Sequence, residues 1–189
     1  MNSTDIINYF IEHKKPFVEI NSFSKLPGIY ALFFIGDNFP VFEEAISQQQ
    51  IIYIGKTLSS QEKRNAKTHF TNGKTGSSTV RKSVGSLLHR SKNLVPIPRN
   101  ESDYKKGRKS HFKFDYTSEN IITNWMSKNL ALGYFDYQKT KDEIDHLETL
   151  IIKDTEPILN IDHKNPNNPY KSAIKKLRKE CATIAFENS

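Results

Sequence analysis

Two short words in the sequence bring together residues that can do acid–base and phosphate chemistry. GIY at 28–30 and YIG at 53–55 each place one phenol in a run of strand-forming residues, and Lys56 follows the second word directly. A phenol has an unperturbed pKa of about 10, so it acts as a base at neutral pH only when a nearby cation lowers that pKa. The words therefore indicate either two ordinary sheet strands or a site where two tyrosines and a cation act together.

The other groups needed for phosphodiester chemistry follow along the chain. A charged helix expected over 60–70 carries Lys63, Arg64 and His69, and a helix expected over 141–154 carries Glu148 beside its apolar face. Cleavage of a phosphodiester needs a base for the attacking water and positive charge for the phosphorane and the leaving oxygen. One metal ion on a carboxylate, together with an arginine, can supply much of that charge.

In this order the residues resemble the GIY-YIG nuclease family. That family implies a metal-dependent endonuclease that hydrolyses phosphodiester bonds in DNA by a one-metal mechanism. A non-cleaving nucleic-acid-binding module of the same fold and an RNA-directed nuclease are the alternatives. The resemblance rests on the words at 28–30 and 53–55 with Lys56, on Lys63, Arg64 and His69, on Glu148 in HLETLI, and on Asn160 in EPILN.

The resemblance implies a role for each matching residue. Tyr30 is the expected general base, with Tyr53 as its partner at the site. Arg64 is the expected arginine for the transition state, because a guanidinium can engage two phosphate oxygens in a planar fork. Glu148 is the expected metal ligand, and a single carboxylate suits one Mg²⁺ or Mn²⁺ per site.

The spacing of the cations departs from the family pattern. Most members have an arginine eight residues after the YIG glycine and a histidine four residues later, whereas Arg64 is nine after Gly55 and His69 five after Arg64. Five residues of an α-helix turn through about 500°, so Arg64 and His69 would not share one face. The catalytic cation is therefore either Arg64 or Lys63. His69 either orients water or contacts phosphate, or is not the counterpart of the family histidine.

Three more residues have open alternatives. Lys56 would either lower the pKa of a tyrosine or hold a phosphate, or it is an ordinary solvated lysine. Arg81 would bind phosphate near the start of a helix, although a plain N-cap explains the same letters. Asn160 would either orient Glu148 or a water molecule, or serve as a turn residue.

Composition favours a polyanionic partner. The 28 Lys and Arg residues exceed the 21 Asp and Glu residues, for a net charge of +7, and neutralising phosphates releases their counterions. The single cysteine, Cys181, excludes an internal disulfide and a multi-thiolate zinc site and is expected to be buried or inert. No long apolar run and no targeting segment is evident, so we expect a cytoplasmic protein without a membrane span. The oligomeric state stays open.

The pattern of elements predicts an α/β (α+β) fold, with a small mixed, mainly antiparallel three-stranded sheet flanked by helices. We expect one domain over 1–189 with a core at 26–161, a basic insertion at about 96–114, partly ordered at best, and a basic helix at about 170–186. The lysines and the arginine of the insertion either contact DNA backbone or belong to a solvated loop; they are Lys105, Lys106, Arg108, Lys109 and Lys113. Strands are expected at 28–35, 51–54 and 132–137, and further helices at 4–13, 78–89 and 118–130.

Overall fold

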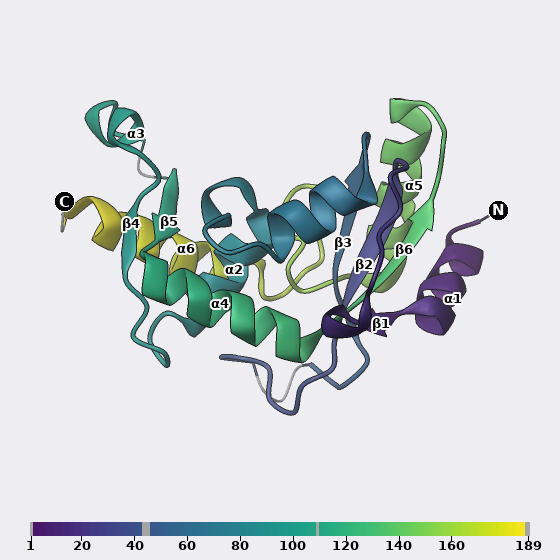
Figure 1. Ribbon diagram of the computed structural model, residues 1–189, viewed down its shortest axis with the longest axis horizontal. Helices are drawn as coiled ribbons and strands as arrows, with labels where there is room; N and C mark the ends of the chain where they lie inside the picture. The colour runs from purple at the N-terminus through teal and green to yellow at the C-terminus, as the bar shows by residue number, and fades with distance from the viewer. Residues whose placement is uncertain (1, 43–45, 109, 188–189) are drawn as a thin grey trace. The chain divides into compact units, whose positions relative to one another are not determined.

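The computed structural model describes residues 2–42, 46–108 and 110–187, and Figure 1 shows its elements. The chain forms two compact units. The first contains the residues up to Lys67 together with Ser127–Lys171, and the second contains Thr68–Met126 and the residues from Ser172 onward. Each unit thus draws on two separate segments of the chain. That the whole chain folds as one domain stays a prediction.

An antiparallel sheet of four strands, in the order β1-β6-β2-β3, forms the centre of the first unit (Figure 1). The three predicted strands and the α/β class are confirmed, and every described strand pair is antiparallel. The fourth strand has only two residues, one of them proline, and so leaves no alternating pattern in the sequence. The strands are β1 (Lys15–Pro16), β2 (Gly28–Phe34), β3 (Ile51–Thr57) and β6 (Leu130–Asp136).

Two helices cover one face of this sheet. Helix α1 (Ser3–His13) begins at Asn2, which forms a capping box with Asp5. Helix α5 (Lys141–Thr155) begins at a second capping box, and both helices place their apolar stripes against the sheet. The core on this face contains Ile6, Phe10, Ile29, Ala31, Phe33, Ile51, Ile54, Ala131, Ile144, Leu147, Ile151 and Ile152.

Successive strand residues point to opposite faces, so Tyr30 points away from these two helices. It lies in register with Gly55 on β3 and with Tyr134 on β6. All seven residues of β2 are buried, so side chains on both faces of this strand are covered. Tyr30 and Tyr53 therefore lie on the face of the sheet away from α1 and α5.

The charged helix after β3 differs from the expected α-helix. Glu62–His69 forms a π-helix, η3, in which hydrogen bonds join residues five apart instead of four. The five-residue interval between Arg64 and His69 therefore matches the hydrogen-bond step of this helix. The rotation of about 500° that an α-helix would give does not apply here.

The second unit contains the short helix η4 and the elements around it. Helix α2 starts at the N-cap Ser78 and lies where it was expected. The predicted basic insertion is more ordered than expected, since the antiparallel pair β4–β5 and helix α3 form within it. The bounds are η4 (Thr75–Ser77), α2 (Thr79–Leu88), β4 (Pro96–Pro98), α3 (Glu101–Lys105), β5 (Phe112–Phe114), α4 (Tyr116–Asn129) and α6 (Lys171–Glu187).

Two further expectations can be compared with the structure. Cys181 is buried as expected, and burial raises the pKa of its thiol to about 11. None of the described helices is long and apolar enough to cross a membrane.

Candidate active site

Tyr30 and Tyr53 meet on one face of the sheet because Gly55 has no side chain. A Cβ atom on Gly55 would lie 2.4 Å from the Tyr30 hydroxyl and 2.8 Å from Tyr53 Cε1. The centroids of the two phenol rings are 6.2 Å apart. The glycine of the second word thus provides the space that the two phenols occupy.

The start of η3 holds Arg64 against the tyrosine pair. Arg64 Nε donates a hydrogen bond to the Tyr30 hydroxyl at 3.3 Å. The helix is fixed to β2 by the fully buried Gln61, whose Nε2 donates to a carbonyl of that strand at 3.4 Å. Asn65 Nδ2 donates in turn to Gln61 Oε1 at 3.0 Å. The cation at the tyrosine pair is therefore Arg64, whereas Lys63 is an exposed residue.

The environment of the two phenols favours their protonated forms. Burial raises the pKa of Tyr30, although the charge and hydrogen bond of Arg64 oppose this. Burial, followed by the proximity of Tyr30, raises the pKa of Tyr53 well above its usual value. Glu148 acts in the same direction on both residues. With the charges of the chain alone, neither phenol is a base at neutral pH, so the role expected of Tyr30 needs an additional cation.

Glu148 lies on α5 with 7% of its surface exposed. Two ammonium groups converge on its Oε2 atom: Lys56 Nζ at 3.2 Å and Lys164 Nζ in a short contact. Lys56 lies in register with Ile29, and so faces α5 and not the tyrosines. The sequence predicted that Lys56 would act on a tyrosine or a phosphate, whereas here carboxylates hold its ammonium.

Asp145, one turn before Glu148 on α5, completes this charged cluster. It pairs with Lys56 and also with Lys141, whose Nζ lies 2.8 Å from Oδ2. Hydrogen bonds from Lys141 and Lys56 lower the pKa of Asp145 to about 2. Burial lowers the pKa of Lys56, but the bonds to Asp145 and Glu148 outweigh burial and leave it raised.

Asn160 fixes the central residue of the second word. Its Oδ1 accepts a hydrogen bond from the backbone N–H of Ile54 at 2.9 Å, and its Nδ2 donates to the carbonyl of Ile54 at 2.8 Å. The amide thus replaces a neighbouring strand at the free edge of β3. Of the alternatives predicted for Asn160, the turn is found, since its N–H donates to the carbonyl of Pro157 at 3.1 Å. The contact of its side chain with the strand was not expected.

Two asparagines of the NPNNPY segment brace the loop that carries Asn160. Asn165 Nδ2 donates to the carbonyl of Pro157 at 2.9 Å, and Asn168 Nδ2 donates to the carbonyl of Ile158 at 2.7 Å. Both side chains are buried. The segment 165–170 therefore holds the loop before it in place.

The donor atoms around Glu148 suit a divalent ion with few protein ligands. Within the described ranges, no group of three or more His, Cys, Asp or Glu side chains could hold a metal. The Oε2 atom of Glu148 already accepts two ammonium groups, so it is a point of negative charge at which a cation can take the place of an ammonium. One carboxylate fits a hard ion that keeps most of its water ligands, such as Mg²⁺ or Mn²⁺, if an ammonium group gives way.

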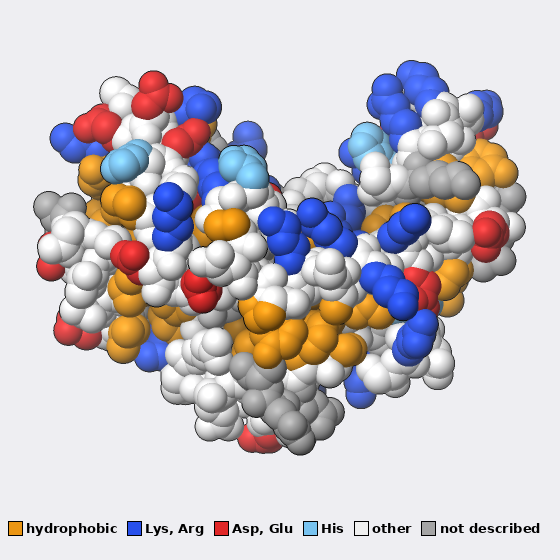
Figure 2. Space-filling model, turned by 180° about the vertical axis from the view of Figure 1, so that it is seen from behind, with side chains coloured by type: hydrophobic (Ala, Val, Ile, Leu, Met, Phe, Trp, Pro, Cys, Tyr) orange, Lys and Arg blue, Asp and Glu red, His pale blue; other side chains and the backbone are white. Residues whose placement is uncertain are grey.

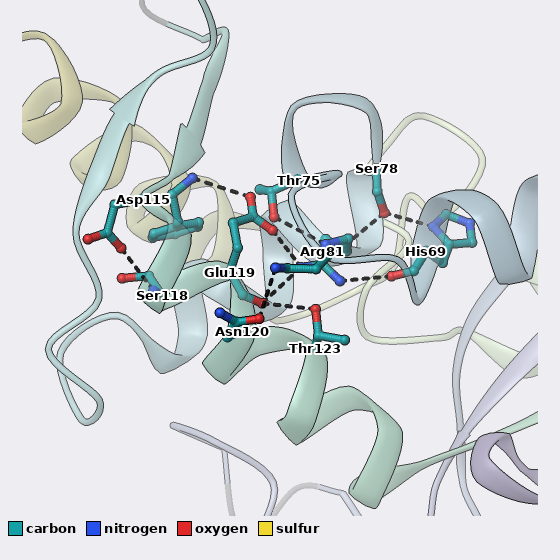
Figure 3. A network of polar contacts seen from close by, with 11 residues as sticks. His69, Thr75, Ser78, Arg81, Asp115, Ser118, Glu119, Asn120 and Thr123 are labelled. Atoms are coloured by element: carbon teal, nitrogen blue, oxygen red, sulfur yellow. Dashed lines mark hydrogen bonds and ion pairs between the residues drawn. The ribbon is translucent and has the colours of Figure 1, made fainter.

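His69 belongs to a buried polar network of the second unit (Figure 3). Its Nδ1 is 2.7 Å from the hydroxyl of Ser78, which caps α2 by accepting from the N–H of Arg81 at 3.1 Å. The Arg81 guanidinium donates to the carbonyl of His69 at 3.1 Å. His69 has no exposed surface, so its expected contact with water or phosphate is not available in this arrangement.

Arg81 is the centre of that network. Its Nη2 pairs with Glu119 Oε2 at 2.5 Å, and its Nε donates to the Thr75 hydroxyl at 3.3 Å. Arg81 is fully buried and Glu119 almost so. The prediction that Arg81 binds nucleic acid is therefore wrong for this state, because a guanidinium without exposed surface cannot reach a phosphate. Its task is to join η4, α2 and α4.

The basic insertion presents its lysines outward around one buried acid. Asp103 accepts a hydrogen bond from Arg99 Nε at 2.6 Å, and its Oδ1 is 3.5 Å from Arg108 Nη1. Lys105 and Lys106 are exposed, and Figure 2 shows Lys and Arg side chains gathered over this part of the second unit. The predicted contact of Lys105, Lys106 and Arg108 with DNA stays a prediction, and Lys109 lies outside the described residues.

Sequence reasoning missed two residues that touch the candidate site. Asp145 reads in the sequence as one of several surface charges of α5, although its position one turn before Glu148 places it on the same side of the helix. Lys164 follows Glu148 by sixteen residues and lies in a loop, so no periodic pattern connects it to the carboxylate.

Comparison with known families supplies an independent finding. The model of the GIY-YIG catalytic domain matches residues 28–180. Neither the curated proteins nor the solved structures contain a significant match to this chain. The matched range includes both tyrosines, Arg64, Glu148 and Asn160.

Proposed function

From the premise that the chain belongs to the GIY-YIG catalytic-domain family, we propose that it is a metal-dependent endonuclease that hydrolyses phosphodiester bonds in DNA. The observation that carries this proposal is the hydrogen bond from Arg64 to Tyr30 in the space left by Gly55. It joins a fixed positive charge to a pair of phenols on one face of the sheet, near enough to Glu148 for that carboxylate to act on both phenols.

Each residue then has a definite task. Arg64 places a permanent positive charge where the phosphorane gathers negative charge, and its attachment through Gln61 limits reorganisation during the reaction. Tyr30 orients the attacking water through its hydroxyl. Once additional positive charge lowers its pKa, the phenol loses its own proton to solvent, and the phenolate accepts the proton of the attacking water. Tyr53 packs beside it and keeps the phenols away from bulk solvent. Asn160 holds β3, and with it Gly55, in register.

Glu148 would hold the divalent ion, Mg²⁺ or Mn²⁺. When bound, such an ion supplies Lewis acidity and positive charge at the scissile phosphate. Lys56 retains Asp145 as a partner when it leaves Glu148, so it can turn toward an anionic substrate without losing all of its ion pairs. The exposed Lys105 and Lys106 of the second unit would contact the DNA backbone without selecting its sequence.

Nicking of supercoiled plasmid tests the proposal. We expect the wild-type chain with Mg²⁺ to convert supercoiled DNA to the open circular form, and EDTA to stop it. Glu148→Gln and Arg64→Ala should each reduce the rate by at least about a hundredfold, in the range known for removal of one charge-stabilising group. Glu12→Gln removes an exposed carboxylate from α1 and should leave the rate unchanged.

Two results would replace the proposal. DNA binding without nicking, under every divalent ion supplied, would favour a binding module that retains the fold. The raised pKa values of Tyr30 and Tyr53 favour this binding module over a nuclease. Faster cleavage of a single-stranded RNA than of the DNA of matched sequence would identify an RNA-directed nuclease.

A further inference from the structure

Lys164 is a residue of the candidate active site to which the proposed function gives no task. Its ammonium contacts Glu148 Oε2, the same oxygen that Lys56 approaches at 3.2 Å. Only 17% of the Lys164 side chain and 10% of the Glu148 side chain are exposed, so solvent and salt screen this pair less than a surface pair. Among the described residues, Glu148 is the one carboxylate that the Lys164 ammonium contacts.

The loop around Lys164 is built to deliver this ammonium. The backbone N–H of Lys164 donates to Asp162 Oδ1 at 3.0 Å. On the other side, the side chain of Asn165 is bonded to the carbonyl of Pro157 at 2.9 Å. Because the backbone is held on both sides, the ammonium is presented to Glu148 at the high effective concentration of a tethered group.

The charges around Glu148 show that its contact with Lys164 opposes the binding of a divalent ion. The cluster around α5 contains the three cations Lys56, Lys141 and Lys164 against the two carboxylates of Asp145 and Glu148. Lys56 and Lys141 share Asp145, so the cluster as a whole keeps one positive charge in excess once Lys164 has neutralised Glu148. A divalent ion approaching Glu148 meets this excess at close range, where Coulomb repulsion is strongest.

We propose that Lys164 competes with the divalent ion for Glu148 and thereby sets the metal concentration at which the site is loaded. The inference rests on the proposed function, because it takes Glu148 as the metal ligand. Lys164 is a positioning residue for the carboxylate in the metal-free chain, and it leaves Glu148 when the ion enters.

The test measures Mn²⁺ binding to the intact chain without DNA, by the electron paramagnetic resonance signal of the free ion. Lys164→Met should lower the dissociation constant for Mn²⁺ about tenfold, as expected for loss of one partly buried competing charge. Lys164→Gln, which keeps a hydrogen-bond donor but no charge, should do the same, and Lys164→Arg should restore weak binding. Lys153→Met removes an exposed lysine of the same helix as Glu148 and should change nothing.

Either of two outcomes overturns the inference. The first is a dissociation constant that is unchanged or larger in both uncharged variants while their circular dichroism matches that of the wild type. The second is Mn²⁺ binding that survives Glu148→Gln, because Lys164 would then have no ion to displace. Plasmid nicking that requires Glu148 can still occur in the first case, so this inference can fail while the proposed endonuclease stands.

Discussion

Gly55→Ala is the sharpest perturbation of the tyrosine pair. The added Cβ would lie 2.4 Å from the Tyr30 hydroxyl and 2.5 Å from its Cζ, so the ring must move by about 0.6 Å to reach the 3.0 Å lower limit of real contacts. Neither strand can yield easily, because β2 is paired on both sides and Asn160 holds β3. We therefore expect Tyr30 to move and its 3.3 Å bond from Arg64 to break.

The cost of Gly55→Ala should appear in both stability and rate. Overpacking a buried site lowers the free energy of unfolding by about 1–3 kcal/mol, and the better strand propensity of alanine returns less than about 1 kcal/mol. A displacement of this size at a catalytic group lowers nicking by about a hundredfold. Urea denaturation and single-turnover nicking measure the two effects.

A double-mutant cycle makes the reasoning refutable. In a Tyr30→Leu background the phenol ring is absent, so adding Gly55→Ala should cost at least about 1 kcal/mol less than it does in the wild type. Equal costs in the two backgrounds would show that the strain lies in the strand and not in the contact with Tyr30. An unchanged nicking rate in Gly55→Ala itself would refute the link between the glycine and Arg64.

Three further predictions concern stability and titration. Asn160→Ala leaves both backbone groups of Ile54 without this partner, so the free energy of unfolding in urea should fall by about 2–3 kcal/mol. Glu119→Gln leaves the buried charge of Arg81 uncompensated, and the same measurement should show a loss of about 3 kcal/mol. The raised pKa of Tyr53 adds stability below pH of about 10 that is lost as pH rises through the raised pKa. Ultraviolet titration should show a late phenolate step that Tyr53→Phe removes.

Each of these predictions has a result that contradicts it. Wild-type stability in Asn160→Ala would mean that water satisfies Ile54 equally well. A Glu119→Gln chain as stable as the wild type would mean that hydrogen bonds to Thr75 and the backbone suffice for Arg81. If all tyrosines ionised together near pH 10, burial would not raise the pKa of Tyr53.

The fold was predictable where local patterns carry it. The dense β-branched and aromatic runs located β2 and β3, and the apolar spacing located α5. The π-helix was not predictable, because the sequence from Glu62 to His69 is mostly polar and its hydrogen bonding depends on where its ends attach. The order of the basic insertion was not predictable for a related reason. Asp103 stabilises the insertion through Arg99 and His111, and these residues come together only in the folded chain.

The tyrosines and the arginine of the site were predictable from the sequence, but the hydrogen bonds that support them were not. Resemblance brought Tyr30, Tyr53 and Arg64 into one hypothesis, and their contacts agree with it. It could not show that the amide of Asn160 binds a strand 106 residues away in sequence. It could not show either that His69 is buried, because a charged helix gives no sign of which end turns inward.

In the proposed mechanism, the contacts of the resting site explain why a cation from outside the chain would be needed. Burial keeps the phenols protonated, and the two lysines on Glu148 neutralise the charge that would attract an ion. Arg64 opposes the first effect but does not overcome it. An added positive charge at Glu148 acts on both: it displaces an ammonium and favours ionisation of the neighbouring phenols. Loading of Glu148 and activation of Tyr30 should therefore be coupled, so that weakening either one in a variant weakens the other.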